Sequence, residues 1–144
     1  MAKTIQITFD AADPRALADF WAEALGYVIE APPEGFTSWD EALTAFGVPE
    51  ELWNSRSAIV DPDGVGPRIF IQQVPEPKTA KNRVHLDLRA AAGVPREGRS
   101  DALEAECARL VALGARRFER LEADGVNEVC IVMLDPEGNE FCLD

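Results

Sequence analysis

Apolar and polar side chains alternate near the start of the chain, where Ile5, Ile7 and Phe9 are separated by single polar residues. Successive side chains of a β-strand point to opposite faces, so a period of two indicates a strand with one buried face. The pattern therefore predicts a half-buried strand at residues 4–9.

The residues after this strand have the spacing of an α-helix. Asp13 is a suitable N-cap, and Pro14 fits the first helical position because its missing amide hydrogen is not needed there. Apolar residues then recur three and four positions apart and form one stripe: Leu17, Phe20, Trp21, Ala24 and Leu25. Gly26 is placed to end the helix, since glycine adopts the left-handed C-cap conformation without strain.

Three further apolar runs predict the strands that complete this first unit: residues 27–30, 56–60 and 68–74. The last two runs are joined by Asp-Pro-Asp-Gly at 61–64, a turn in which proline presets φ and glycine accepts a positive φ. Residues 32–55 form an insert that is partly helical. It is either a lid-like segment or a helix that covers a sheet edge, and the sequence favours neither.

The second half of the chain repeats this order. Ala-Leu-Gly at 24–26 returns at 112–114, and the turn at 61–64 returns as Asp-Pro-Glu-Gly at 135–138. The repeated elements are a strand, a helix and three strands at residues 84–88, 100–113, 116–121, 128–134 and 140–143.

The repeat predicts the domain organisation. We expect one domain over residues 1–144, in which module 1 covers about 1–76 and module 2 about 82–144. Module 1 carries the insert at 32–55, whereas module 2 carries extra chain before its helix.

Composition narrows the classes of function. The net charge of −12 argues against binding to nucleic acid or to an anionic membrane surface, because both require Lys and Arg. No apolar run approaches the roughly 20 residues of a membrane span. Three cysteines without Cys-x-x-Cys spacing predict reduced thiols and a cytoplasmic protein.

Several motifs together resemble the vicinal-oxygen-chelate superfamily, which contains glyoxalase I, the fosfomycin and bleomycin resistance proteins and the extradiol dioxygenases. The motifs are the repeated βαβββ order, Ala-Asp-Pro-x-x-Leu-Ala-x-Phe-Trp at 12–21, the paired turns and Gly-Asn-Glu-Phe-Cys-Leu at 138–143. Residues 74–88 resemble a bacterial subgroup of glyoxalase-like domains. The resemblance implies an α+β fold in which two βαβββ modules form a cupped mixed sheet with the helices on its outer face.

Strand parity then assigns side chains to the inner face of the cup. If Val84, Leu86 and Leu88 face the helices, the residues between them face the cleft. The predicted ligand-binding residues are Gln6, Thr8, Phe70, Gln72, Asp87, Arg89 and Cys142. His85 and Glu140 are predicted to form a hydrogen-bonded pair, either orienting a ligand or satisfying each other.

The resemblance also maps the superfamily's metal-ligand positions onto Gln6, Gln72, His85 and Cys142, with Glu140 on the same face as Cys142. Glutamine is a weak neutral ligand, and a single histidine cannot supply a site of two or three His. We therefore expect no metal and no other cofactor.

Other candidate residues have two interpretations each. Cys142 is interpreted as a packed residue, with a thiolate nucleophile as the alternative. Asp87 and Arg89 either fix a polar substrate or form a salt bridge. Trp39 and Trp53 are predicted to cover the sheet, with stacking on an aromatic ligand as the alternative.

Two functions remain open. The first is a protein that binds a small organic molecule in the cup between its modules without a catalytic metal. The alternative is an enzyme of isomerase, lyase or metal-dependent oxygenase type that uses His85 and Glu140 as acid and base or as ligands. By analogy with the superfamily, we expect a homodimer.

Overall fold

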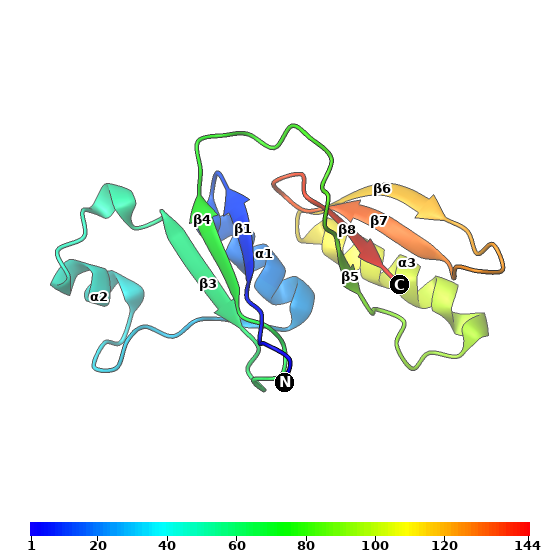
Figure 1. The fold of residues 1–144 in the computed structure, drawn as a ribbon, viewed down its shortest axis with the longest axis horizontal. Helices are drawn as coiled ribbons and strands as arrows, with labels where there is room; N and C mark the ends of the chain where they lie inside the picture. Colours follow the sequence, from blue (N-terminus) through cyan, green and yellow to red (C-terminus); the bar gives the residue numbers. More distant parts are fainter. The chain divides into compact units, whose positions relative to one another are not determined.

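A computed structural model describes all 144 residues, and the chain divides into two compact units, Met1–Pro77 and Lys78–Asp144 (Figure 1). Each unit contains one four-stranded mixed sheet, and each follows the order βαβββ. The predicted α+β fold built from a repeated unit is confirmed. None of the helices has the length and apolar character that crossing a membrane requires.

The first unit has the sheet order β1-β4-β3-β2, in which β1 is parallel to β4 and the other pairs are antiparallel. Its strands and main helix are β1 (Ile7–Ala11), α1 (Pro14–Leu25), β2 (Val28–Ile29), β3 (Arg56–Val60) and β4 (Ile69–Gln73). Between β2 and β3, the insert contains the helix α2 (Trp39–Ala45) and the 3-10 turn η1 (Glu50–Leu52).

The second unit repeats this topology with the sheet order β5-β8-β7-β6, and β5 is parallel to β8. Its elements are β5 (Leu86–Leu88), α3 (Arg96–Ala112), β6 (Arg116–Leu121), β7 (Cys130–Leu134) and β8 (Glu140–Leu143). A β-bulge interrupts the pairing of β6 with β7 between Arg117 and Glu119. The equivalent order of strands in the two sheets is the structural counterpart of the sequence repeat.

The first strand of each unit begins later than its sequence pattern predicts. β1 begins at Ile7, where pairing with Ile69 of β4 begins, and Ile5 is 71% exposed. β5 begins at Leu86, and Val84 is 77% exposed. Alternation of side chains continues beyond the paired region in the sequence, but a strand requires a neighbour to accept and donate its backbone hydrogen bonds.

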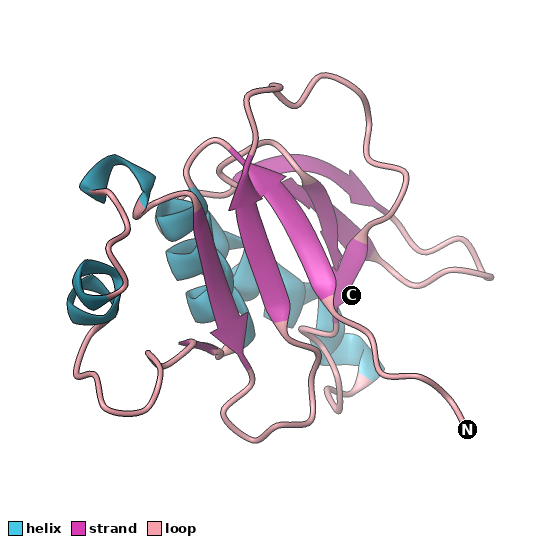
Figure 2. Ribbon diagram, turned by 60° about the vertical axis from the view of Figure 1, so that its left-hand side comes forward, coloured by secondary structure: helices cyan, strands magenta, loops and turns pink.

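One face of the first sheet packs against α1 (Figure 2). The predicted caps of that helix are confirmed: the Asp13 side chain accepts a hydrogen bond from the Ala16 amide at 3.2 Å, and Gly26 ends the helix with φ 71°. Trp21 lies in the core of this unit, stacked on Phe9 with ring centroids 5.3 Å apart.

The second sheet packs against α3 in the same way. Leu103, Cys107 and Leu110 form the buried stripe of this helix, whereas Val111 is 46% exposed. Opposite them, the sheet contributes a fully buried set of side chains: Ile131, Met133, Phe141 and Leu143.

Candidate ligand-binding cavity

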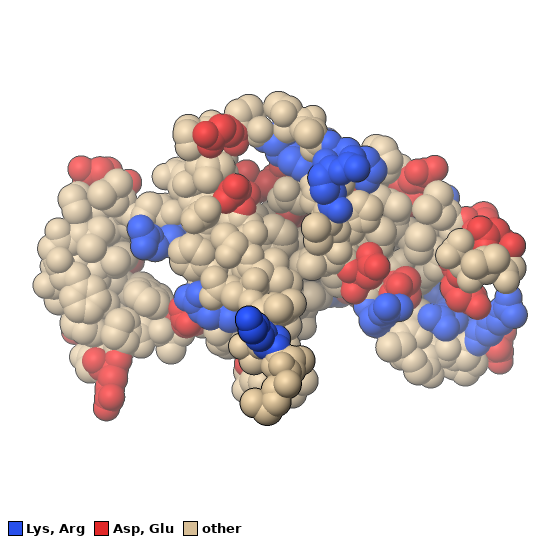
Figure 3. Space-filling view, viewed as in Figure 1, with Lys and Arg blue, Asp and Glu red and all other residues tan.

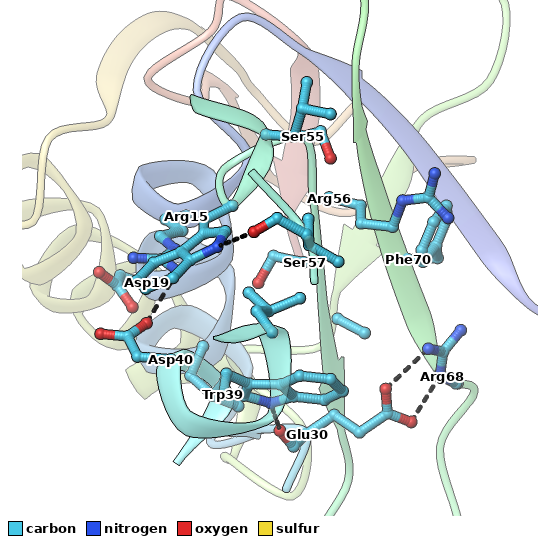
Figure 4. A pocket seen from close by; sticks show the side chains of 16 residues that line it. Arg15, Asp19, Glu30, Trp39, Asp40, Ser55, Arg56, Ser57, Arg68 and Phe70 are labelled. Carbon is cyan, nitrogen blue, oxygen red and sulfur yellow. Dashed lines mark hydrogen bonds and ion pairs between the residues drawn. The ribbon is translucent and has the colours of Figure 1, made fainter. Parts of the chain in front are cut away.

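A cavity of about 600 Å³ lies in the first unit, between the insert and the edge of the sheet. Its walls come from the insert, from β3 and β4, and from α1 (Figure 4). Half of its sixteen lining residues are apolar: Ile29, Trp39, Leu43, Val48, Leu52, Trp53, Ala58 and Phe70. The volume falls within the range typical of small-molecule sites.

The shortness of β2 creates this space. β2 pairs with β3 only at Ile59 and Val60, and the following residue, Glu30, donates its amide to the Ala58 carbonyl at 2.9 Å. The remaining edge of β3, at Arg56 and Ser57, has no neighbouring strand. The insert lies opposite this edge without pairing with it, and the cavity is the space between the insert and β3.

The fold of the insert is specified locally. Ser38 caps α2 by accepting a hydrogen bond from the Glu41 amide at 3.1 Å. Glu41 in turn accepts bonds from the amide and the hydroxyl of Thr37, at 2.8 and 2.7 Å. These backbone and side-chain donors lower the pKa of Glu41. These bonds fix the start of the helix in a variant of the capping box, in which Glu41 binds Thr37, the residue before the N-cap, instead of Ser38 itself.

Two contacts attach the end of the insert to α1. Asn54 accepts the Arg15 amide at 2.9 Å and donates to the Asp13 carboxylate at 2.8 Å. The bond from Asn54, followed by the Ala16 amide, lowers the pKa of Asp13. Arg15 also forms an exposed ion pair with Asp40 of the insert at 3.3 Å. The N-cap of α1 therefore also positions one wall of the cavity.

The two tryptophans of the insert have their indole N–H groups occupied. Trp39 donates to the Glu30 carbonyl at 2.6 Å, and Trp53 donates to the Val48 carbonyl at 2.9 Å. Both side chains are half-buried and line the cavity. Both interpretations made from the sequence stay predictions, because these rings border the cavity and also lie next to the edge of the sheet.

Arg68 is the most constrained charged residue of the cavity. Its guanidinium forms two hydrogen bonds to the Glu30 carboxylate, at 2.8 and 2.7 Å, and a third to Gln6 at 2.8 Å. The same group lies 5.5 Å from the centre of the Phe70 ring. The bonds to Arg68 lower the pKa of Glu30, so the pair is charged at neutral pH.

Arg56 and Asp19 line the cavity without an ion-pair partner. In Figure 4, Arg56 extends from β3 toward Phe70, whereas Asp19 extends from α1. Basic side chains are also visible at the border of the hollow between the insert and the sheet (Figure 3). Neither Arg56 nor Asp19 was among the site residues predicted from the sequence.

Of the four ligand-binding residues predicted in the first unit, only Phe70 lines the cavity. Gln6 is bonded to Arg68, and Gln72 donates to Asp10 at 2.9 Å. Thr8 is exposed and lies beside Phe70 in the pairing of β1 with β4.

In the second unit, the predicted hydrogen-bonded pair of His85 and Glu140 does not form, which corrects the sequence prediction. His85 is exposed, and its Nε2 lies 3.2 Å from the Lys81 ammonium. Glu140 instead binds the Lys78 ammonium at 3.3 Å and the Asn82 amide at 3.0 Å. Strand parity does not fix the orientation of His85, because this residue precedes the paired part of its strand.

Cys142 lies opposite Asp87 in the pairing of β5 with β8. Burial, and then the negative charge of Asp87, raises the pKa of Cys142 to about 11. A thiol with this pKa is protonated at neutral pH, which argues against the nucleophile and for the packed residue. Arg89 pairs with Asp144 at 3.0 Å, so of the two interpretations of Asp87 and Arg89, the salt bridge between them is not observed.

Residues 6–143 match the family described as "Glyoxalase-like domain", and the chain belongs to this family. Among solved structures, a possible glyoxalase from Bacillus cereus is 12% identical with a TM-score of 0.61, covering 99% of this chain and 98% of the other. A glyoxalase/bleomycin resistance protein/dioxygenase family enzyme from Burkholderia phytofirmans PsJN is 14% identical with a TM-score of 0.62, covering 99% and 97%.

The fosfomycin resistance protein FosX from Listeria monocytogenes, in complex with Mn(II) and sulfate, is 12% identical with a TM-score of 0.62, covering 99% of this chain and 89% of the other. These likenesses show the vicinal-oxygen-chelate fold. No match was found among curated proteins.

The residues at the superfamily's metal-ligand positions do not fit a metal ion. Within either unit, no three His, Cys, Asp or Glu side chains are grouped so that they could hold one. His85 and Glu140 each lie next to a lysine ammonium group, which a metal cation would have to displace. Gln6 and Gln72 offer only neutral amide oxygens, and Gln6 uses its oxygen to bind Arg68.

Proposed function

We propose that this glyoxalase-like protein binds a small organic molecule with an aromatic part in the cavity between the insert and the first sheet. The observation that carries the proposal is the cavity of about 600 Å³ whose walls include Trp39, Trp53 and Phe70. The proposal places the ligand inside the first unit, at a site that the insert completes.

The state of the two indole N–H groups supports a ligand with a planar, apolar part. The indole N–H groups of Trp39 and Trp53 are held by backbone carbonyls, so the rings offer their faces and edges rather than donors. Aromatic rings fixed in this way bind other rings by stacking and by removing apolar surface from water. Few polar groups remain to fix the orientation of such a molecule, as is usual in small-molecule sites.

The enzymatic alternative, with His85 and Glu140 as acid and base, has less support. The two side chains have separate lysine partners, and general acid–base catalysis requires both groups within hydrogen-bond reach of one substrate. We therefore propose binding as the function of the site at the insert, and the catalytic role of these two residues stays a prediction.

The Ala58→Phe variant tests the location of the ligand. Ala58 lies in the cavity wall on β3, so a phenyl ring there would occupy part of the space. The neutral probe naphthalene-1-acetamide should bind the wild-type protein with a Kd on the order of 0.1 mM. Binding to Ala58→Phe, measured by isothermal titration calorimetry, should be at least about tenfold weaker because the ring displaces the probe.

Val111→Phe is the matched control, because it adds the same ring at an exposed position on α3 of the second unit. This variant should bind the probe as the wild type does. Circular dichroism would show that both variants are folded. Equal affinity of the wild type and Ala58→Phe, or no binding by the wild type, would contradict the proposal.

A further inference from the structure

The charged residues that line the cavity differ in whether they have an ion-pair partner. Of its three arginines, Arg15 is paired with Asp40 at 3.3 Å and Arg68 with Glu30 at 2.7 Å. Arg56 has no acidic partner and forms no side-chain hydrogen bond. A guanidinium has five N–H donors in a planar fork that matches a carboxylate or phosphate, and those of Arg56 are available.

The backbone of Arg56 adds a second donor at the same place. The Ser55 carbonyl accepts a hydrogen bond from the Gln73 amide at 2.8 Å, so it points toward β4. In a trans peptide, the following N–H points the opposite way, and the Arg56 N–H is therefore directed away from β4, toward the insert. No strand pairs with β3 at this position, because β2 pairs only with Ile59 and Val60.

Arg56 also lies beside the aromatic part of the wall. Figure 4 shows its side chain extending toward Phe70, on the neighbouring strand β4. A ring bound against Phe70 would thus place a substituent near the Arg56 guanidinium. Asp19, the other unpaired charge, belongs to α1 and lies away from Phe70.

We propose that the ligand is an aromatic carboxylate whose anionic group is bound by Arg56; this inference rests on the proposed function and assigns its ligand class. The net charge of the protein, −12, repels anions at long range, so such a ligand would be held by local contacts. A carboxylate on a guanidinium forms short, charge-assisted hydrogen bonds that a neutral amide cannot match.

The test compares two probes of nearly the same shape, naphthalene-1-acetate and naphthalene-1-acetamide, by calorimetry. The wild type should bind the carboxylate about tenfold more tightly than the amide, a ratio expected for one charge-assisted contact. In Arg56→Gln this preference should disappear, with the affinity for the amide within about twofold of wild type. Arg56→Lys should retain part of the preference, since it keeps the charge without the fork.

Arg116→Gln is the control, since it changes the net charge equally at an exposed position on β6 of the second unit. It should retain the full preference for the carboxylate. Equal binding of both probes by the wild type would overturn the inference and leave the proposed function standing. Loss of the preference in Arg116→Gln would also overturn it, whereas a wild type that binds neither probe would overturn both proposals.

Discussion

Trp21→Ala should lower the free energy of unfolding by about 3–5 kcal/mol, the range found for removal of large buried aromatic side chains. Trp21 is 1% exposed, stacks on Phe9 with ring centroids 5.3 Å apart, and meets the edge of Phe20 at 5.4 Å. Removing the indole leaves a cavity between α1 and β1, because close-packed neighbours refill such a space only in part. Urea unfolding followed by circular dichroism measures the loss.

Trp21→Phe is the matched comparison, since it keeps an aromatic ring in the same place. Trp21→Phe should lower the free energy of unfolding clearly less than Trp21→Ala does. A loss below about 1 kcal/mol for Trp21→Ala would mean that the residue is not in the core of the first unit.

Asp135→Ala should destabilise the protein by about 2–4 kcal/mol, because it leaves three half-buried donors without their acceptor. Asp135 is fully buried, and its carboxylate accepts bonds from the Glu137 amide, the Asn139 amide and the Asn139 side chain, each at 2.9 Å. The turn in which it lies connects β7 to β8.

The sequence repeat provides a control for this variant within the same chain. Asp61 has the equivalent position in the first unit and accepts three backbone amides, at 2.7 to 3.0 Å. Asp61 is more exposed than Asp135, so water can replace the lost acceptor. Urea unfolding should therefore show a smaller loss for Asp61→Ala, and equal losses would contradict the role assigned to burial.

The features that could be predicted from the sequence are those with local causes. The cap at Asp13, the helix end at Gly26 and the stripe that includes Leu17 follow from neighbouring residues and were confirmed. The repeated order of elements was also predictable, because each unit carries its own hydrophobic pattern and its own turn.

The positions of polar side chains were harder to predict. His85 follows the alternation of its strand in the sequence, but the paired strand begins at Leu86, so strand parity does not fix its orientation. Its partner Lys81 lies four residues earlier and outside any regular element. The partner of Glu140, Lys78, lies outside the elements of the repeat as well.

The cavity itself could not be predicted, because it depends on contacts between distant segments. The insert returns to α1 through Asn54, 41 residues after its partner Asp13. Arg56 was overlooked because an exposed arginine at the start of a strand is common. The available signal was the pair of tryptophans, Trp39 and Trp53, in an insert between two strands of one sheet.

The central claim, that a small molecule binds between the insert and the first sheet, is tested most directly by fluorine NMR of protein labelled with 5-fluorotryptophan. The chain has three tryptophans, so three resonances are expected, and single Trp→Phe variants would assign them. Trp39 and Trp53 line the cavity, whereas Trp21 is buried in the core and serves as an internal reference. Titration with naphthalene-1-acetamide should shift the Trp39 and Trp53 resonances in a saturable manner and leave that of Trp21 in place. Unchanged Trp39 and Trp53 resonances at saturating probe would contradict the account.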